Sequence, residues 1–256
     1  MKGGWFGVAA LLLLAAVVFA ANDSEKTGGP NAAALRYEAT VHFSRELPGS
    51  CREHAVERFR KFRRDEKTSD APVGVVFIGD SLVEGWAPLP RTTPHAALNR
   101  GISCDTTLGV HERLIRDVVA AKPRVAVILA GTNDLTLFHR LAAHDRAFHV
   151  VQSITSLAQR LQGHGIKPVV VSIPPTRVTF SGLSVRATNL LIRDVNGDLL
   201  RNCRRLGAEF WNIHRLVSDA NGQLKEGFTY DGLHLSSDAY QHINRHLTSR
   251  LRALLR

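Results

Sequence analysis

The stretch Val73-Gly74-Val75-Val76-Phe77-Ile78-Gly79-Asp80-Ser81-Leu82 decides the fold class of this chain. Its first six residues are apolar or glycine and rich in β-branched side chains, as in a strand that is buried on both faces. Gly79, Asp80 and Ser81 are residue types that favour a turn, here between the strand and a helix. A strand of this kind is typical of a parallel sheet that is covered by helices.

Further segments extend this pattern along the chain. Apolar runs predict strands at 97–100, 125–130, 168–173 and 208–211. Apolar residues spaced by three and four predict amphipathic helices at 107–121, 146–161, 184–206 and 236–255. Because alternating strands and helices form right-handed βαβ units, we expect an α/β fold, a three-layer α/β/α sandwich around a parallel five-stranded sheet.

The length and composition fit one globular domain preceded by other segments. The chain has 256 residues, of which 44% are apolar and 22% are charged, values typical of a folded protein. We predict a signal peptide or N-terminal anchor at 1–21, a linker and helical extension at 22–67, and the α/β domain at 68–256. Within the extension, a helix is predicted at about 51–64.

Residues 1–21 have the order of a secretory signal peptide. Lys2 supplies a basic start, an uninterrupted apolar run extends from Val8 to Val18, and Ala20-Ala21 stands before polar residues. We therefore expect export to the periplasm or the medium. The alternatives are a buried core helix or an uncleaved membrane anchor, although a spanning helix needs about 20 apolar residues.

The formal net charge of +10 does not by itself indicate a nucleic-acid-binding protein. The densest basic cluster, at 58–64, stands beside acidic residues, and no nucleic-acid-binding motif is present. A solvated helix face explains this cluster, and we expect only transient contact with an anionic membrane surface or the cell wall. The histidine spacings lack a convincing ligand set, so we expect no metal and no cofactor.

The chain contains three cysteines, Cys51, Cys104 and Cys203. One pair can form a disulfide in an oxidising compartment, but the sequence leaves open which pair it is. Cys104 stands three residues after Gly101, and we expect it to be buried or disulfide-bonded rather than a nucleophile.

Glycines and polar residues follow the ends of the predicted strands. Gly79-Asp80-Ser81 follows the first strand, Gly101 follows the second, and Gly131-Thr132-Asn133-Asp134 follows the third. Asp231-Gly232-Leu233-His234 precedes the last helix. Because ligands of open parallel sheets bind beyond the carboxyl ends of the strands, these four segments can converge at one edge.

The residue types in these segments suit the cleavage of an ester. Ser81 is the expected nucleophile and His234 the expected base, because imidazole accepts a proton readily near neutral pH. Asp231, three residues before His234, is expected to orient the imidazole ring. The backbone N–H groups of Ser81 and Gly101 and the side-chain amide of Asn133 are the expected oxyanion-hole donors.

Three neighbouring residues receive other roles. We expect Asp80 to cap the helix that follows it or to brace the loop, rather than to act as the triad acid. Trp86 is expected to pack in the interior rather than to stack on a substrate. For Arg177, the sequence leaves open whether the side chain contacts substrate or lies on the surface.

These motifs together resemble the SGNH hydrolases of the GDSL esterase/lipase family. Ser81 stands in Gly-Asp-Ser-Leu, Gly101 ends Asn-Arg-Gly, Asn133 stands in Gly-Thr-Asn-Asp, and His234 ends Asp-Gly-Leu-His. All four occur in the family's order, and the resemblance covers roughly 73–250.

The resemblance implies a flavodoxin-like sheet, a Ser-His-Asp triad, no cofactor, and the hydrolysis of acyl or acetyl esters. Trp86 also recurs in bacterial members similar to platelet-activating-factor acetylhydrolase and to carbohydrate O-acetylesterases.

We therefore expect an exported serine esterase that acts on short-chain or acetyl esters of a small molecule, lipid or glycan. The alternatives are an acyltransferase that uses the same acyl-enzyme and an inactive exported binding protein of the same fold. The sequence does not determine the acyl length or the oligomeric state.

Overall fold

The computed structural model describes residues 49–68, 72–92, 94–137, 142–180 and 182–256. The predicted signal peptide and most of the predicted linker lie outside these residues. Within the described ranges, no helix combines the length and the apolar character that a membrane crossing requires.

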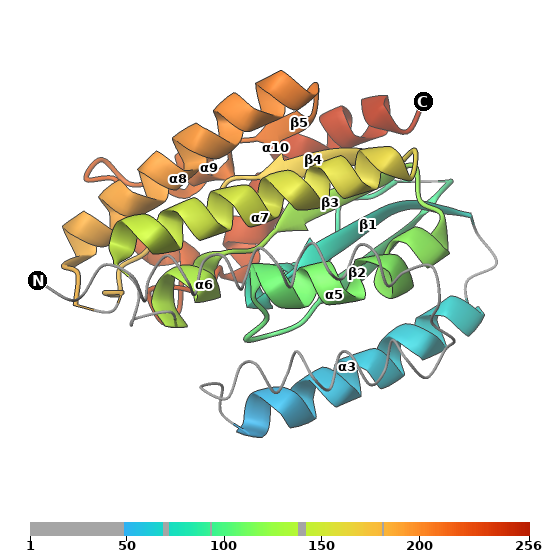
Figure 1. Cartoon of the computed structure of the whole chain (residues 1–256), viewed down its shortest axis with the longest axis horizontal. Coiled ribbons are helices and arrows are strands. Elements are labelled where there is room, and N and C mark those ends of the chain that lie inside the picture. The colour runs from blue at the N-terminus through green and yellow to red at the C-terminus, as the bar shows by residue number, and fades with distance from the viewer. Residues whose placement is uncertain (1–48, 69–71, 93, 138–141, 181) are drawn as a thin grey trace, which may run out of the picture. The chain divides into compact units, whose positions relative to one another are not determined.

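A parallel five-stranded sheet forms the centre of the fold (Figure 1). Its strands follow the order β2-β1-β3-β4-β5, and every neighbouring pair is parallel. The strands are β1 (Val73–Gly79), β2 (Ala96–Gly101), β3 (Val125–Leu129), β4 (Lys167–Val171) and β5 (Glu209–Trp211). The predicted fold class is confirmed, and each predicted strand is present.

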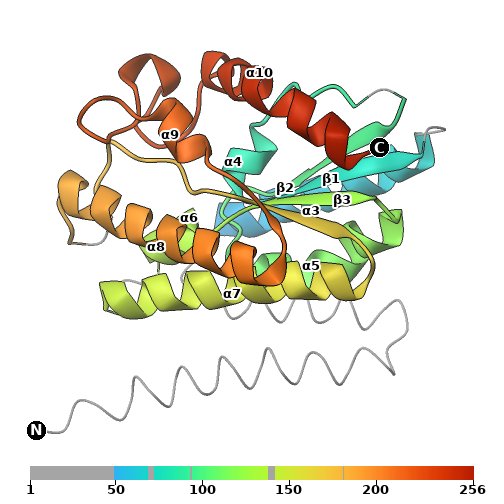
Figure 2. The same ribbon diagram turned by 90° about the horizontal axis from the view of Figure 1, so that it is seen from above.

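Helices cover both faces of this sheet (Figure 2). One face carries α5 (Thr107–Asp117), α6 (Thr132–Leu137), α7 (Ala143–Gly163) and α8 (Val185–Leu206). The opposite face carries α4 (Ser81–Glu84), α9 (Ile213–Val217) and α10 (Ser237–Leu254). Two short 3-10 helices lie in the connections, η1 (Val119–Ala121) before β3 and η2 (Glu226–Phe228) before α10.

A further helix, α3 (Gly49–Thr68), precedes the sheet in the chain. It contains the helix that the sequence predicted at 51–64 and extends beyond both of its ends. Arg58 of α3 donates from Nε to the carbonyl of Gly101 at 2.9 Å, so α3 contacts the edge strand β2.

Among the helices predicted after the first strand, two differ from their predicted boundaries by more than one residue. The helix predicted at 107–121 divides into α5 and η1, because Val118 leaves the helical conformation with φ −120° and ψ −60°. The helix predicted at 146–161 begins earlier, at Ala143, and continues to Gly163.

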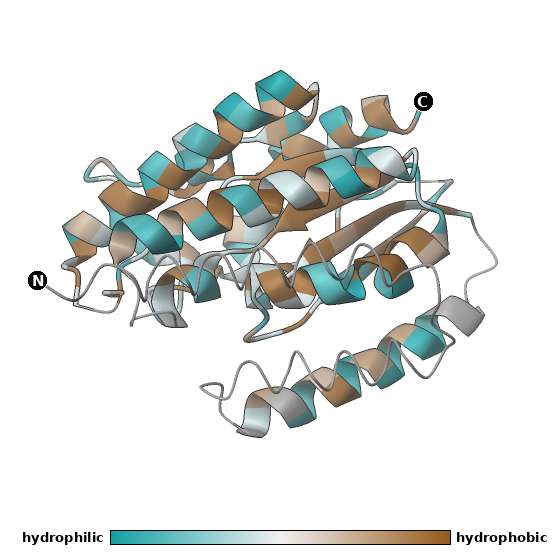
Figure 3. Ribbon diagram, in the orientation of Figure 1, coloured by the Kyte–Doolittle hydropathy of each residue, from teal (hydrophilic) through white to brown (hydrophobic). Residues whose placement is uncertain are grey.

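The uninterrupted apolar run in β1 reflects burial on both of its faces. Val76 and Ile78 belong to the core on one side of the sheet, whereas Val75 and Phe77 belong to the core on the other side. All four side chains are 0% exposed. The hydropathy of the chain shows the same arrangement, with apolar strands between helices of mixed character (Figure 3).

The register of the sheet brings the ends of three strands to one level. Gly79, the last residue of β1, lies opposite Gly101 of β2 and Leu129 of β3. The segments that follow these strands therefore leave the sheet at the same edge, as expected for parallel strands.

We predict that Gly79→Ala destabilises the protein. A Cβ atom at Gly79 would lie 1.7 Å from the carbonyl oxygen of Leu129, which is backbone and cannot rotate away. We expect the free energy of unfolding to fall by more than about 1 kcal/mol in denaturant titrations.

Gly163→Ala is the matched control, because a Cβ atom there meets nothing within 4 Å. This variant should be neutral or slightly more stable. Equal stability of the two variants would contradict the close approach of β1 and β3 at Gly79.

Candidate active site

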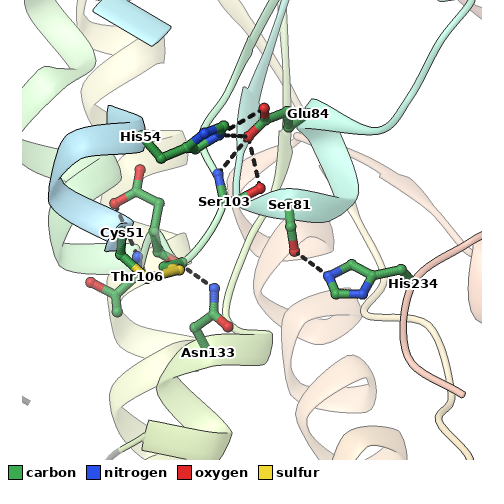
Figure 4. The surroundings of a disulfide bond; sticks show 10 residues. Cys51, His54, Ser81, Glu84, Ser103, Thr106, Asn133 and His234 are labelled. Atoms are coloured by element: carbon green, nitrogen blue, oxygen red, sulfur yellow. Dashed lines mark hydrogen bonds and ion pairs between the residues drawn. A yellow bond between two sulfur atoms is a disulfide. The ribbon is translucent and has the colours of Figure 1, made fainter. Parts of the chain in front are cut away.

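The structure brings Ser81 and His234 together from segments far apart in the chain. Ser81 is the first residue of α4, directly after the end of β1, and its side chain is half-buried. Its Oγ lies 3.0 Å from Nε2 of His234, within hydrogen-bond distance (Figure 4).

The Asp231-Gly232-Leu233-His234 segment forms a turn that closes on its own carboxylate. Oδ2 of Asp231 lies 2.6 Å from Nδ1 of His234. Oδ1 of Asp231 accepts the backbone N–H groups of Leu233 at 2.9 Å and His234 at 2.8 Å. The spacing of three residues therefore allows one carboxylate to hold both the ring and the backbone of the histidine.

Several favourable contacts act on the charge of Asp231. Partial burial by itself would raise the pKa of this carboxyl group. The hydrogen bonds from the side chain and backbone of His234 and from the backbone of Leu233 outweigh burial and lower the pKa below its ordinary value. Asp231 is consequently a carboxylate at neutral pH, the state that can stabilise an imidazolium ion.

Arg177 braces this turn through its backbone. Its N–H donates to the carbonyl of Gly232 at 2.7 Å. Its guanidinium donates from Nε to the carbonyl of Leu224 and from Nη2 to Asp219, at 2.7 and 3.0 Å. These contacts give Arg177 a structural role, a question that the sequence left open.

Tyr230 lies at the site, although it was not among the predicted site residues. Its ring stacks on the imidazole of His234, with centroids 5.9 Å apart and planes within 9°. Because 75% of Tyr230 is exposed, the ring forms part of the solvent-facing wall beside His234. An aromatic residue immediately before the Asp-x-x-His motif is the only hint that the sequence offers.

Asp80 and Trp86 have the structural roles that the sequence predicted. Oδ1 of Asp80 accepts the backbone N–H of Leu82 at 2.9 Å and so caps α4. Trp86 is 0% exposed and donates from Nε1 to Asn244 at 2.8 Å.

The geometry corrects the prediction for Gly101. Its backbone N–H already donates to Oδ1 of Asn99 at 2.9 Å, so this hydrogen is not available to an oxyanion. The steric part of the prediction is confirmed, because a Cβ atom at Gly101 would lie 2.1 Å from the backbone nitrogen of Glu84. Glycine is required here so that β2 can approach α4.

Asn133 stands near the start of α6 and is oriented by the segment after β2. Its Nδ2 donates one hydrogen to the carbonyl of Asp105 at 2.8 Å. Among the described residues, the second hydrogen of this amide has no acceptor. The amide can therefore still donate to a bound group.

Residues 102–106, which we call the donor loop, are held to α4 by Glu84. This carboxylate accepts the backbone N–H and the hydroxyl of Ser103 at 2.7 and 2.8 Å. It also lies 2.9 Å from Nε2 of His54 on α3. Burial alone would raise the pKa of Glu84, but hydrogen bonds from His54 and Ser103 and the charge of Arg58 lower it.

A disulfide bond joins Cys51 of α3 to Cys104 of the donor loop (Figure 4). This resolves the pairing that the sequence left open. Cys203 is a buried free cysteine, and burial raises the pKa of its thiol to about 11. No cluster of three or more His, Cys, Asp or Glu side chains suited to a metal ion occurs in the part of the chain that the structure describes.

One family model matches most of the described chain. Residues 77–242 match the model of the GDSL-like lipase/acylhydrolase family. A curated relative, N-acylneuraminate cytidylyltransferase of Escherichia coli, is 24% identical over 172 residues, or 67% of this chain. The chain spans only 38% of the length of that relative.

Three similar solved structures illustrate the range of esterases with this fold. A GDSL-like lipase from Bacteroides thetaiotaomicron is 23% identical with a TM-score of 0.62, covering 76% of this chain and 97% of that one. The carbohydrate acetylesterase Est24 from Sinorhizobium meliloti is 17% identical with a TM-score of 0.55, covering 71% and 99%. An aryl esterase from M. smegmatis is 16% identical with a TM-score of 0.53, also covering 71% and 99%. At these identities, the likeness establishes the shared fold.

We predict that the stability difference between the wild type and Asp80→Asn depends on pH. Asp80 is 0% exposed, and burial raises its pKa to about 7. An unfolded aspartate has a pKa of about 3.9. The folded protein therefore holds the proton more tightly, and the wild type loses stability relative to Asp80→Asn as the pH rises through this window.

Denaturant titrations at about pH 5 and about pH 8 should show a relative loss that approaches about 1 kcal/mol per pH unit within the window. Asp194→Asn, at an exposed position of α8, controls for the loss of one negative charge. A difference at Asp80 no larger than that control would contradict the raised pKa.

Proposed function

Because the chain belongs to the GDSL-like lipase/acylhydrolase family, we propose that it is a serine esterase with Ser81, His234 and Asp231 as its triad. One observation carries this proposal. Contacts of 3.0 and 2.6 Å link the Ser81 hydroxyl, the His234 ring and the Asp231 carboxylate in one continuous chain. This is the arrangement by which an imidazole activates a serine hydroxyl.

In the proposed reaction, Oγ of Ser81 attacks the ester carbonyl while Nε2 of His234 takes the hydroxyl proton. The Asp231 carboxylate stabilises the imidazolium that forms. His234 then gives the proton to the leaving alcohol, and an acyl-enzyme remains on Ser81. Water, activated by the same histidine, hydrolyses this acyl-enzyme and releases the acid.

The tetrahedral intermediate needs hydrogen-bond donors for its oxyanion. We assign this role to the backbone N–H of Ser81 and to the second amide hydrogen of Asn133. Among the described residues, neither has another acceptor. Each such donor typically contributes about 3–4 kcal/mol to transition-state stabilisation.

The proposed substrates are short-chain or acetyl esters of a small molecule, lipid or glycan. Similar folds occur in proteins named as a lipase, a carbohydrate acetylesterase and an aryl esterase, which supports an ester but does not select one. The shape and chemistry of the pocket determine which molecule receives the acyl group from the acyl-enzyme, water or an alcohol. Acyl transfer to a sugar hydroxyl is therefore the second candidate. Product analysis separates the two, since hydrolysis yields only the free acid and transfer yields a new sugar ester.

The proposed site of action is outside the cytoplasm, in the periplasm or the medium. The Cys51–Cys104 disulfide supports this proposal, because structural disulfides persist mainly in oxidising compartments. An N-terminal membrane anchor is the alternative, and sequencing the N-terminus of the mature protein distinguishes the two.

We predict that Ser81→Ala lowers kcat by at least about 10³-fold, because the variant has no nucleophile and cannot form the acyl-enzyme. The measurement is hydrolysis of p-nitrophenyl acetate, butyrate and palmitate. The ester that the wild type hydrolyses fastest also identifies the preferred acyl length.

Ser237→Ala, at an exposed position at the start of α10, is the matched control and should retain the wild-type rate. Equal activity of Ser81→Ala and the wild type would exclude the proposed mechanism.

We predict that Asp231→Asn lowers kcat much more than Asp80→Asn does. An amide at position 231 cannot stabilise the imidazolium, and the equivalent change in a serine protease costs about 10⁴-fold. Asp80 caps α4 through Oδ1, and an asparagine retains an oxygen that can do the same. Steady-state kinetics of both variants identify the triad acid, and a larger loss at Asp80 would reverse the assignment.

A further inference from the structure

We propose that helix α3 is a positioning element of the oxyanion hole, and that the Cys51–Cys104 disulfide is its main link to the site. This inference rests on the proposed esterase function. It goes beyond that function, because α3 lies before residue 77, where the family match begins.

Three residues on one face of α3 contact the surroundings of the site. Cys51, His54 and Arg58 are spaced by three and four residues, so they lie side by side on the helix. Cys51 binds the donor loop covalently, and His54 contacts the Glu84 carboxylate at 2.9 Å. Arg58 donates to the carbonyl of Gly101 at 2.9 Å, directly before the donor loop.

The donor loop in turn connects the two proposed donors. Ser103 is bound to Glu84, which belongs to the same helix as Ser81. The carbonyl of Asp105 orients the Asn133 amide at 2.8 Å. Cys104 lies between these two anchored residues, so the disulfide fixes the loop at its midpoint (Figure 4).

The backbone of Cys104 has two features that point to the oxyanion hole. Its φ is +67°, a conformation that residues other than glycine rarely adopt. In the described part of the chain, its N–H has no acceptor, whereas the N–H of Gly101 is bound to Asn99. We therefore assign the third oxyanion donor to the Cys104 N–H, which the disulfide to Cys51 holds in place.

The first test compares the oxidised and reduced wild type. Dithiothreitol converts the disulfide to two thiols and is itself oxidised to its cyclic disulfide. We expect kcat for p-nitrophenyl acetate to fall about tenfold or more, with little change in KM, since misplacing one donor weakens mainly transition-state binding. Circular dichroism below the melting temperature verifies that the reduced protein is folded.

Phenylboronic acid provides a readout that does not require turnover. Its boron accepts Oγ of Ser81 and becomes tetrahedral, and the hydroxyl proton passes to His234. Because one boronate oxygen then occupies the oxyanion position, we expect its affinity to fall in parallel with kcat on reduction. A disulfide that served only stability would leave both the affinity and kcat of the folded enzyme unchanged, and that result would overturn the proposal.

Two cysteine variants supply the controls. Cys51→Ser should be as slow as the reduced wild type and should no longer respond to dithiothreitol. Cys203→Ser, which removes the free cysteine, should behave as the wild type does. Thiol titration of denatured, untreated wild type should give one thiol of the three cysteines, and three thiols would overturn the proposal.

A rescue variant tests the role of the backbone at position 104. Glycine adopts positive φ readily, so adding Cys104→Gly to Cys51→Ser should recover part of the lost kcat. No recovery would overturn the claim that the disulfide maintains this conformation.

The failure of this inference is distinguishable from the failure of the proposed function. Activity that survives Ser81→Ala, or oxidised wild type without esterase activity, would refute the esterase proposal. Equal kcat and equal boronate affinity of the wild type and Cys51→Ser, with activity still dependent on Ser81, would refute only the role of α3. If the protein had no turnover, the boronate affinities alone would decide the role of α3.

Discussion

The buried guanidinium of Arg113 joins the ends of β1 and β2 to the donor loop, and the geometry of the site depends on this junction. Nη2 donates to the carbonyl of Gly79 at 2.9 Å, Nη1 to the carbonyl of Arg100 at 2.7 Å, and Nε to Asp105 at 2.8 Å. One side chain can reach all three only because the parallel register brings both strand ends to one level. Breaking a buried ion pair typically costs about 3–5 kcal/mol. The junction therefore strongly restricts the position of Ser81, which follows the end of β1.

The two sides of the site differ in their exposure to solvent. On one side, Asp105 and Arg113 are buried, and the Glu84 side chain is only 20% exposed. On the other side, the side chains of His234 and Asp231 are 31% and 39% exposed. The buried side holds the donor loop, and the proposed oxyanion donors there can keep their positions during the reaction. The base His234 faces the solvent, from which water arrives and into which the alcohol leaves.

Helix α3 precedes the residues that the family model matches, and it contacts both the edge of the sheet and the site. The edge strand β2 would otherwise present unpaired backbone groups, and α3 contacts this strand at the carbonyl of Gly101. Phe62 of α3 lies against the guanidinium of Arg100, with 4.7 Å between the ring centroid and Cζ. Covering an edge strand is a common need of open sheets. Here the covering helix also reaches the loop that carries the proposed donors.

Much of this architecture could be predicted from the sequence, because local physical requirements are visible in it. A strand that is buried on both faces must be apolar throughout, as 73–78 and 125–130 are. Ser81 directly follows such a strand, so its position at the carboxyl edge of the sheet was predictable. For His234, the motif before the last helix carried the prediction. The three-residue spacing of Asp231 and His234 similarly anticipated their contact.

The remaining features depend on contacts between distant segments, which no local pattern encodes. The N–H of Gly101 is occupied by Asn99, Cys51 selects Cys104 rather than Cys203, and Tyr230 stacks on His234. By itself, the sequence determined the strands, the helices and the order of the chemical groups, because hydrophobic periodicity and turn residues act locally. Only the tertiary structure decided which hydrogen bonds are already used and which cysteines meet, because both depend on distances that exist only after the chain has packed.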